Sequence, residues 1–153
     1  MSKSGRYSAD RKNIESVTGT TKVIEVSECG TIFFMDTAAA ACTYTLPRAD
    51  LAGPGWWCKF VQGVDHNDAD HVIQINSEDV GAFGTDVHNL HYTAPSAGAH
   101  PDATTGSAST AMRKVTLQGS ATEIGDQLEV VCDGTRWFMT ALHSGSAIVS
   151  ELT

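Results

Sequence analysis

At 153 residues, of which 41% are hydrophobic and 18% charged, the chain has the size and composition of one globular domain rather than of a disordered protein. Thr, Glu, Lys or Gly interrupts every apolar run well before the roughly 18 to 20 residues of a membrane-spanning helix, which argues against a membrane protein. A net charge of −8 argues against nucleic acid as a partner, because an acidic surface repels phosphate.

The first 20 residues differ from the rest of the chain in charge. Residues 1–20 carry a net charge of +2, whereas the remaining residues, with six basic and 16 acidic side chains, carry −10. We predict an extended polar arm over residues 1–20, followed by a β domain over residues 21–153. This arm lacks the apolar segment of a secretory signal, so we expect synthesis in the cytoplasm. The basic side chains of the arm are Lys3, Arg6, Arg11 and Lys12.

Apolar residues alternate with a period of two along most of the chain, and no window keeps the helical i, i+3, i+4, i+7 spacing. We therefore predict a single all-β domain, built as an antiparallel β-sandwich or a jelly-roll-like barrel. The alanine run at residues 38–41 is too short to form a helix, and we expect a link or a single turn there. Predicted strands span residues 22–27, 31–36, 43–46, 56–62, 71–76, 114–118, 127–132, 136–142 and 148–152, with a weaker candidate at 89–92.

The four cysteines stand singly in strand-like segments, without the paired spacing of zinc or redox sites. We expect them to be buried free thiols that pack as small hydrophobic side chains. They are Cys29, Cys42, Cys58 and Cys132.

Two adjacent tryptophans, Trp56 and Trp57, follow a Gly-Pro-Gly turn at residues 53–55. Neighbouring residues of a strand point to opposite faces, so one indole is expected in the core. The other is expected to be exposed, covered by the arm or buried in an interface, and a platform for sugar stacking is the alternative.

Two polar segments contain residue types that bind metals. Residues 65–71, DHNDADH, gather carboxylate and amide oxygens but lack the central Gly and closing Glu of a calcium loop, which favours a polar turn. His88, His91 and His100 lie in a Gly/Ala/Ser-rich segment that offers no rigid face for zinc. We predict neither a metal nor a cofactor.

The composition changes between residues 78 and 112, where Gly, Ala, Ser, Thr, His and Pro dominate. Loops of more than roughly 12 to 15 residues are unusual in compact domains unless they bind a partner or stay disordered. We predict a long loop or extension that forms an exposed lobe or reaches a neighbouring subunit.

The pair Asp133-Gly134, between two β-rich runs, predicts a hairpin, because a tight turn needs positive φ angles. With a two-residue loop, Val130 lies opposite Trp137 and Leu128 lies opposite Met139. One face of the hairpin then forms core, with Leu128, Val130, Cys132, Trp137 and Met139.

The other face of this hairpin carries Glu129, Val131, Arg136 and Phe138. We expect this face to meet a second sheet or a neighbouring subunit. Together with Trp56 and Trp57, Phe138 is therefore a candidate interface residue.

Several segments resemble a known family. They are GTIFFMDT at residues 30–37, TYTLP at 43–47, WWCKFV at 56–61, VIQIN at 72–76 and GDQLEVVCDGTRWFM at 125–139. Over residues 30–76 and 125–142 the pattern resembles a β-rich module of tailed-bacteriophage virion proteins, which include capsid decoration (cement) proteins, head fibres and tail-fibre segments. The resemblance implies a homotrimer on the virion surface.

Among these roles, the short chain favours a capsid decoration protein, because a receptor-binding fibre normally carries a shaft or an attachment domain. Its expected partners are further copies of itself and the major capsid protein, on which the basic arm is expected to lie. The alternative is a receptor- or glycan-binding module of a tail or head fibre. We predict no enzymatic activity, since the sequence has no nucleophile elbow, phosphate-binding loop or dinucleotide fingerprint.

Overall fold

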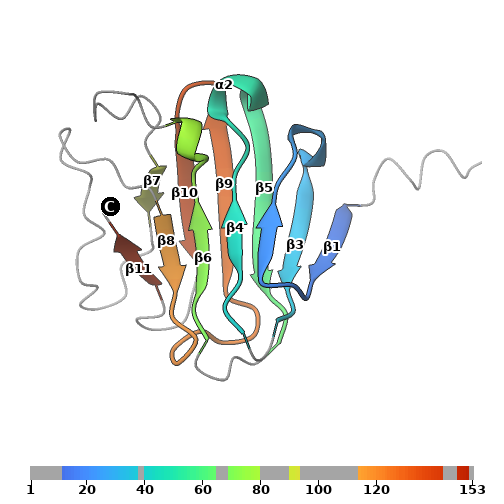
Figure 1. Cartoon of the computed structure of the whole chain (residues 1–153), viewed down its shortest axis with the longest axis vertical. Helices are drawn as coiled ribbons and strands as arrows, with labels where there is room; N and C mark the ends of the chain where they lie inside the picture. Colours follow the sequence, from blue (N-terminus) through green and yellow to red (C-terminus); the bar gives the residue numbers. More distant parts are fainter. Residues whose placement is uncertain are drawn as a thin grey trace, which may run out of the picture.

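The computed structural model describes residues 12–37, 40–64, 69–79, 90–93, 114–142 and 148–151, and for residues 90–93 and 148–151 the backbone alone. Strands dominate these residues, so the all-β prediction is confirmed (Figure 1). In chain order the strands are β1 (Asn13–Val17), β2 (Thr21–Val23), β3 (Thr31–Met35), β4 (Thr43–Thr45), β5 (Pro54–Gln62), β6 (His71–Gln74), β7 (Leu90–Thr93), β8 (Lys114–Leu117), β9 (Gln127–Asp133), β10 (Trp137–Leu142) and β11 (Ile148–Glu151). The short helical segments of the described residues are η1 (Val26–Glu28), α2 (Ala49–Ala52) and η2 (Ser77–Asp79).

The strands form two mixed sheets. Sheet A has the order β1-β3-β5-β9-β10-β7, and sheet B has the order β11-β8-β6-β4-β2. The antiparallel arrangement that we predicted holds for β9 with β5 and β10, and for β8 with β6 and β11. It is wrong for β1–β3, β3–β5, β2–β4, β4–β6 and β10–β7, which pair in parallel. Neither sheet closes into a barrel within the described residues.

From β1 to β6 the chain alternates between the sheets. Strands β1, β3 and β5 therefore lie in parallel in sheet A, and β2, β4 and β6 lie in parallel in sheet B. Parallel neighbours need a crossover between them, which in most proteins is a helix. Here the crossover is a strand of the opposite sheet, so the first half of the chain winds as a flattened coil.

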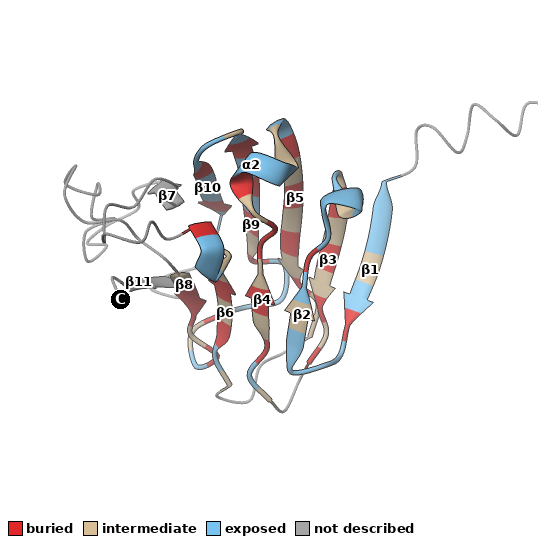
Figure 2. Ribbon diagram, turned by 45° about the horizontal axis from the view of Figure 1, so that its top comes forward, coloured by how far each residue is buried: buried red, intermediate tan, exposed pale blue. Residues whose placement is uncertain are grey.

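A layer of buried side chains joins the two sheets. Tyr44 of β4 packs edge-on against Phe60 of β5, with ring centroids 5.2 Å apart, and Phe60 stacks on Phe33 of β3 at 5.6 Å. Trp56 and Trp137 meet edge to face at 5.3 Å in the same core. In Figure 2, buried and less buried residues alternate along β5 and β9, which is the period of two seen in the sequence.

One helical turn closes the connection between β4 and β5. Helix α2 begins after Arg48, and both carboxylate oxygens of buried Asp79 accept the backbone N–H of Ala49 at 3.2 Å. Gly53 ends the turn with φ of +77°, a conformation that glycine adopts without steric cost. The sequence analysis missed this turn, because four residues are too few for a helical period.

Several predicted boundaries change in the structure. Residues 13–17, which we placed in the extended arm, form β1 at the edge of sheet A, and residues 1–11 lie outside the described residues. Within the segment predicted as a long loop, residues 90–93 form β7, close to the weaker strand candidate. Residues 80–89 and 94–113, with His88 and His100, lie outside the described residues.

The cysteine prediction is correct for three of the four side chains. All four are free thiols, but Cys29 is exposed whereas the others are buried. Desolvation by burial raises the pKa of Cys58 well above its usual value, so this thiol stays protonated. His71, at the end of the segment that we weighed as a calcium loop, is buried and its Nδ1 accepts the backbone N–H of Cys42 at 3.1 Å.

We expect the aromatic contact between the sheets to dominate stability. Phe60→Ala should lower the free energy of unfolding by about 3–5 kcal/mol, because it leaves a cavity between the sheets. Tyr44→Phe should be nearly neutral or stabilising, since the only neighbour recorded for the buried Tyr44 hydroxyl within the described residues is the Cys42 thiol, a weak hydrogen-bonding group. Chemical denaturation of both variants tests this, and a loss of more than about 2 kcal/mol for Tyr44→Phe would contradict it.

Candidate functional site

The predicted hairpin is present, with a different register. Strands β9 and β10 are antiparallel, but Cys132 lies opposite Trp137 and Val130 lies opposite Met139, so the predicted pairing is wrong by two residues. A shift of two residues keeps every side chain on the same face. The predicted core residues Leu128, Val130, Cys132, Trp137 and Met139 are accordingly all buried.

The register differs because the turn lies one residue further along the chain. The backbone N–H of Asp133 donates to the Arg136 carbonyl at 3.1 Å, so this bond encloses Gly134 and Thr135 instead of Asp133 and Gly134. Asp133 Oδ1 accepts the backbone N–H groups of Thr135 and Arg136 at 2.8 and 2.6 Å, and Gly134 has φ of +92°. Desolvation opposes ionisation of Asp133, but these bonds and the Arg136 guanidinium outweigh it and lower the pKa of Asp133.

The two tryptophans point to opposite faces of β5, as predicted. Trp56 is buried, and its indole N–H donates to the Val26 carbonyl at 2.8 Å. Trp57 is half-buried on the outer face of sheet A, which is the face turned away from sheet B. The ammonium of Lys12, from the predicted arm, lies 5.3 Å from the centre of the Trp57 ring. Of the expected outcomes for the second indole, partial cover by the arm is the one that the structure bears out.

The hairpin extends this outer face. Trp57 lies opposite Val131 on β9, and Val131 lies opposite Phe138 on β10, so the three side chains form one row across sheet A. Val131 and Phe138 are exposed. The second sheet covers the inner face instead, and Lys12 lies over Trp57 at one end of the row.

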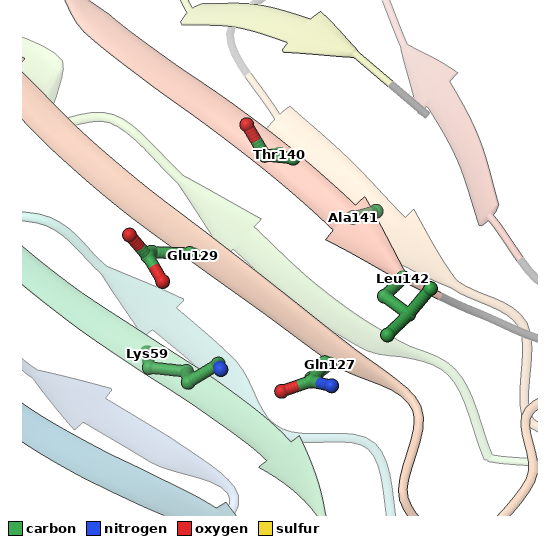
Figure 3. A pocket seen from close by; sticks show the side chains of 6 residues that line it. All are labelled: Lys59, Gln127, Glu129, Thr140, Ala141 and Leu142. Atoms are coloured by element: carbon green, nitrogen blue, oxygen red, sulfur yellow. The ribbon is translucent and has the colours of Figure 1, made fainter. Parts of the chain in front are cut away.

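Two shallow hollows lie on the outer face of sheet A. One, of about 300 Å³, is lined by Lys12, Gly55, Trp57, Glu129 and Val131. The other, of about 250 Å³, is lined by Lys59, Gln127, Glu129, Thr140, Ala141 and Leu142 (Figure 3). Glu129 belongs to both, so the hollows adjoin each other across β5, β9 and β10.

Four polar side chains of these hollows make no hydrogen bond or ion pair within the described residues. They are those of Lys59, Gln127, Glu129 and Thr140. Lys59 lies opposite Glu129, and Glu129 lies opposite Thr140, on three neighbouring strands. Their donors and acceptors are therefore available to a bound molecule.

A second exposed surface lies where both sheets end. We call it the N-terminal edge, formed by β1 and β2, which Figure 2 shows side by side, together with η1. Its exposed apolar side chains are those of Ile14, Val23 and Val26. Ile14 is 62% exposed, Val23 is 63% exposed and Val26 is 39% exposed. Of the predicted arm cations, Lys12 adjoins this edge, and Lys3, Arg6 and Arg11 lie outside the described residues.

An ion network closes the core behind the N-terminal edge. Lys22 Nζ lies 2.8 Å from Glu15 and 2.6 Å from Glu28, and 5.4 Å from the centre of the Phe33 ring. Burial opposes the charge of Lys22, but the two carboxylates outweigh it and raise the pKa of Lys22. The charged network separates the aromatic core from the exposed apolar side chains of the edge.

The described residues contain no group of three or more His, Cys, Asp or Glu side chains that could hold a metal ion. They also include no helix of the length and hydrophobicity that crossing a membrane requires. The chain matches no protein-family model and no curated protein. The family resemblance therefore stays a prediction from sequence pattern.

The sequence analysis missed the polar residues of the hollows. Lys59, Gln127 and Glu129 alternate with core residues, so the period of two places them on the outer face. That period carries no information on which strands are neighbours. The antiparallel pairing of β9 with β5 on one side and with β10 on the other brings these residues together.

Asp133 offers a test of the turn. We expect Asp133→Ala to lower the free energy of unfolding at pH 7 by about 1 kcal/mol, because two backbone N–H groups lose a charged acceptor at an exposed site. A lowered folded-state pKa stabilises the protein above the unfolded value of about 3.9, and this contribution is lost as pH falls through the folded-state pKa. The difference between variant and wild type should therefore shrink in urea titrations near pH 3.

Glu129→Ala is the matched control, since Glu129 lies on the same strand and has no partner within the described residues. It should change stability by less than about 0.5 kcal/mol at either pH. Equal effects of the two substitutions at pH 7 would contradict the role of Asp133.

Proposed function

We propose that this chain is a structural protein of a bacteriophage virion, a capsid decoration (cement) protein that binds the capsid exterior through its N-terminal edge. It is made in the host cytoplasm, acts on the virion surface and has no catalytic role. The resemblance over residues 30–76 and 125–142 suggests the virion setting. The observation that carries the proposal is the exposed apolar surface formed by Ile14, Val23 and Val26 next to a basic N-terminal segment.

Three properties make this edge suitable for attachment. Both sheets end there, so β1 and β2 each have one strand partner within the described residues and one side with unpaired backbone groups. Large exposed apolar side chains that lie close together are a common feature of protein interaction sites. The basic side chains of residues 1–12 add a charge opposite to that of the acidic body and can pair with acidic groups on a capsid.

The body behind the edge suits a mechanical role. In this proposal the two facing sheets act as a sandwich, and three copies assemble into a homotrimer that bridges neighbouring capsomers. Attachment to the expanded shell stabilises that shell by linkage, because the ligand binds one state of the capsid and not the other. The ion pairs of Lys22 with Glu15 and Glu28 lie within the body of the domain, and the exposed apolar side chains of the edge are left for the contact with the capsid.

The attachment surface can be tested by substitution. The double variant Ile14→Lys with Val23→Lys should bind expanded capsid shells lacking the protein at least about tenfold more weakly than wild type, because it places two charges at the centre of the contact. Co-sedimentation with such shells, over a range of protein concentrations, measures the affinity. Both residues are exposed, so thermal unfolding should be unchanged.

Leu51→Lys is the control, because Leu51 is 61% exposed but lies on α2, away from the N-terminal edge. It should bind as wild type does. Wild-type affinity of the double variant would overturn the assignment of the edge. Gel densitometry that finds only a few copies per particle would overturn the decoration role itself.

A further inference from the structure

We propose that the two hollows on the outer face of sheet A form one carbohydrate-binding groove, which takes a short chain of neutral pyranose units with Trp57 as its stacking platform. The groove lies over β5, β9 and β10, whereas the proposed capsid contact lies over β1, β2 and η1. Lys12 is the one described residue named for both surfaces. This inference therefore goes beyond the decoration role and does not depend on it.

Trp57 has the position that stacking requires. Its indole is half-buried on a central strand of sheet A, and it lines the larger hollow. Gly30, the residue before β3, lies beside the ring, and its φ of +81° favours glycine at this position. The hydrogen bond from the Gly30 N–H to the Trp57 carbonyl at 2.7 Å holds the backbone that carries the indole.

The polar groups of the groove match the hydroxyl groups of a sugar. Lys59 supplies donors, Glu129 supplies acceptors, and Gln127 and Thr140 supply both. Figure 3 shows these side chains on neighbouring strands around one hollow. Opposed residues on neighbouring strands are about 5 Å apart and alternate residues of one strand about 7 Å apart, a spacing comparable to the length of one pyranose unit in an oligosaccharide.

The same residues argue against a protein partner at this groove. Lys and Glu are depleted in the buried centres of protein interfaces, and here Lys59 and Glu129 lie in the middle of the face. An apolar rim of Trp57, Val131 and Leu142 around polar groups without partners is instead typical of a small-ligand site. Because strands carry all these side chains, the groove is largely preformed.

A glycan array probed with the full-length labelled protein tests the proposal. The array carries neutral hexose oligosaccharides, and sialylated and uronate-bearing oligosaccharides form a second arm. We expect binding to neutral chains, followed by calorimetric titration with the best neutral oligosaccharide. Trp57→Ala should weaken that binding at least about tenfold, and Trp57→Phe should restore part of it.

Two further variants guard against a loss caused by misfolding. Glu129→Gln is exposed and keeps the shape of the side chain, and we expect affinity to fall by several-fold through the loss of a charged acceptor. Phe138→Ala is the matched control: Phe138 is an exposed aromatic residue in the same row as Trp57 and lines neither hollow. It should bind as wild type does.

An array without hits, hits confined to the acidic arm, or equal affinity of wild type and Trp57→Ala would each overturn the neutral-glycan groove. Co-sedimentation of Trp57→Ala with capsid shells separates the two proposals. The affinity of Trp57→Ala for the shells should match that of wild type. The glycan proposal can therefore fail while the decoration role stands, and the decoration role can fail while the glycan proposal stands.

Discussion

Strands β5, β9 and β10 bury only one of their two faces, because a layer of side chains fills the space between the two sheets. Tyr44 from sheet B and Phe60 from sheet A make the central contact, and Phe33, Trp56 and Trp137 extend the aromatic layer. Every alternate residue is therefore directed outward. That constraint places Trp57, Lys59 and Glu129 on an exposed face that the fold itself does not need, and it makes them available to a ligand.

The two exposed surfaces differ in how polar and apolar side chains are arranged. At the N-terminal edge, Lys22 forms ion pairs with Glu15 and Glu28, whereas Ile14 and Val23 are exposed to solvent. On the outer face of sheet A the order is reversed, with polar side chains at the centre and apolar side chains around them. An exposed apolar surface close in sequence to a basic segment suits a protein partner, whereas a polar centre beside an indole suits a sugar.

The β9–β10 hairpin shows which structural features the local sequence pattern can predict. Alternation of apolar residues identified the buried face of β9 and β10 correctly, and the error of two residues in register left it intact. The error came from the position of the turn, because Asp133 pairs with Arg136 and its side chain accepts the backbone N–H groups of Thr135 and Arg136, which places Gly134 and Thr135 in the turn. Side-chain capping of this kind depends on atomic geometry, which residue type suggests but does not specify.

By itself the amino-acid sequence determined the all-β class, most strand positions, the buried face of the β9–β10 hairpin and the opposite orientations of Trp56 and Trp57. These properties depend on neighbouring residues along one strand, and the period of two records them directly. The tertiary structure alone decided the parallel winding between sheets, the inclusion of residues 13–17 as an edge strand, and the assembly of the groove from β5, β9 and β10. Strand pairing joins segments that are far apart in the chain, and it is selected by how the whole aromatic layer packs, which no local period can encode.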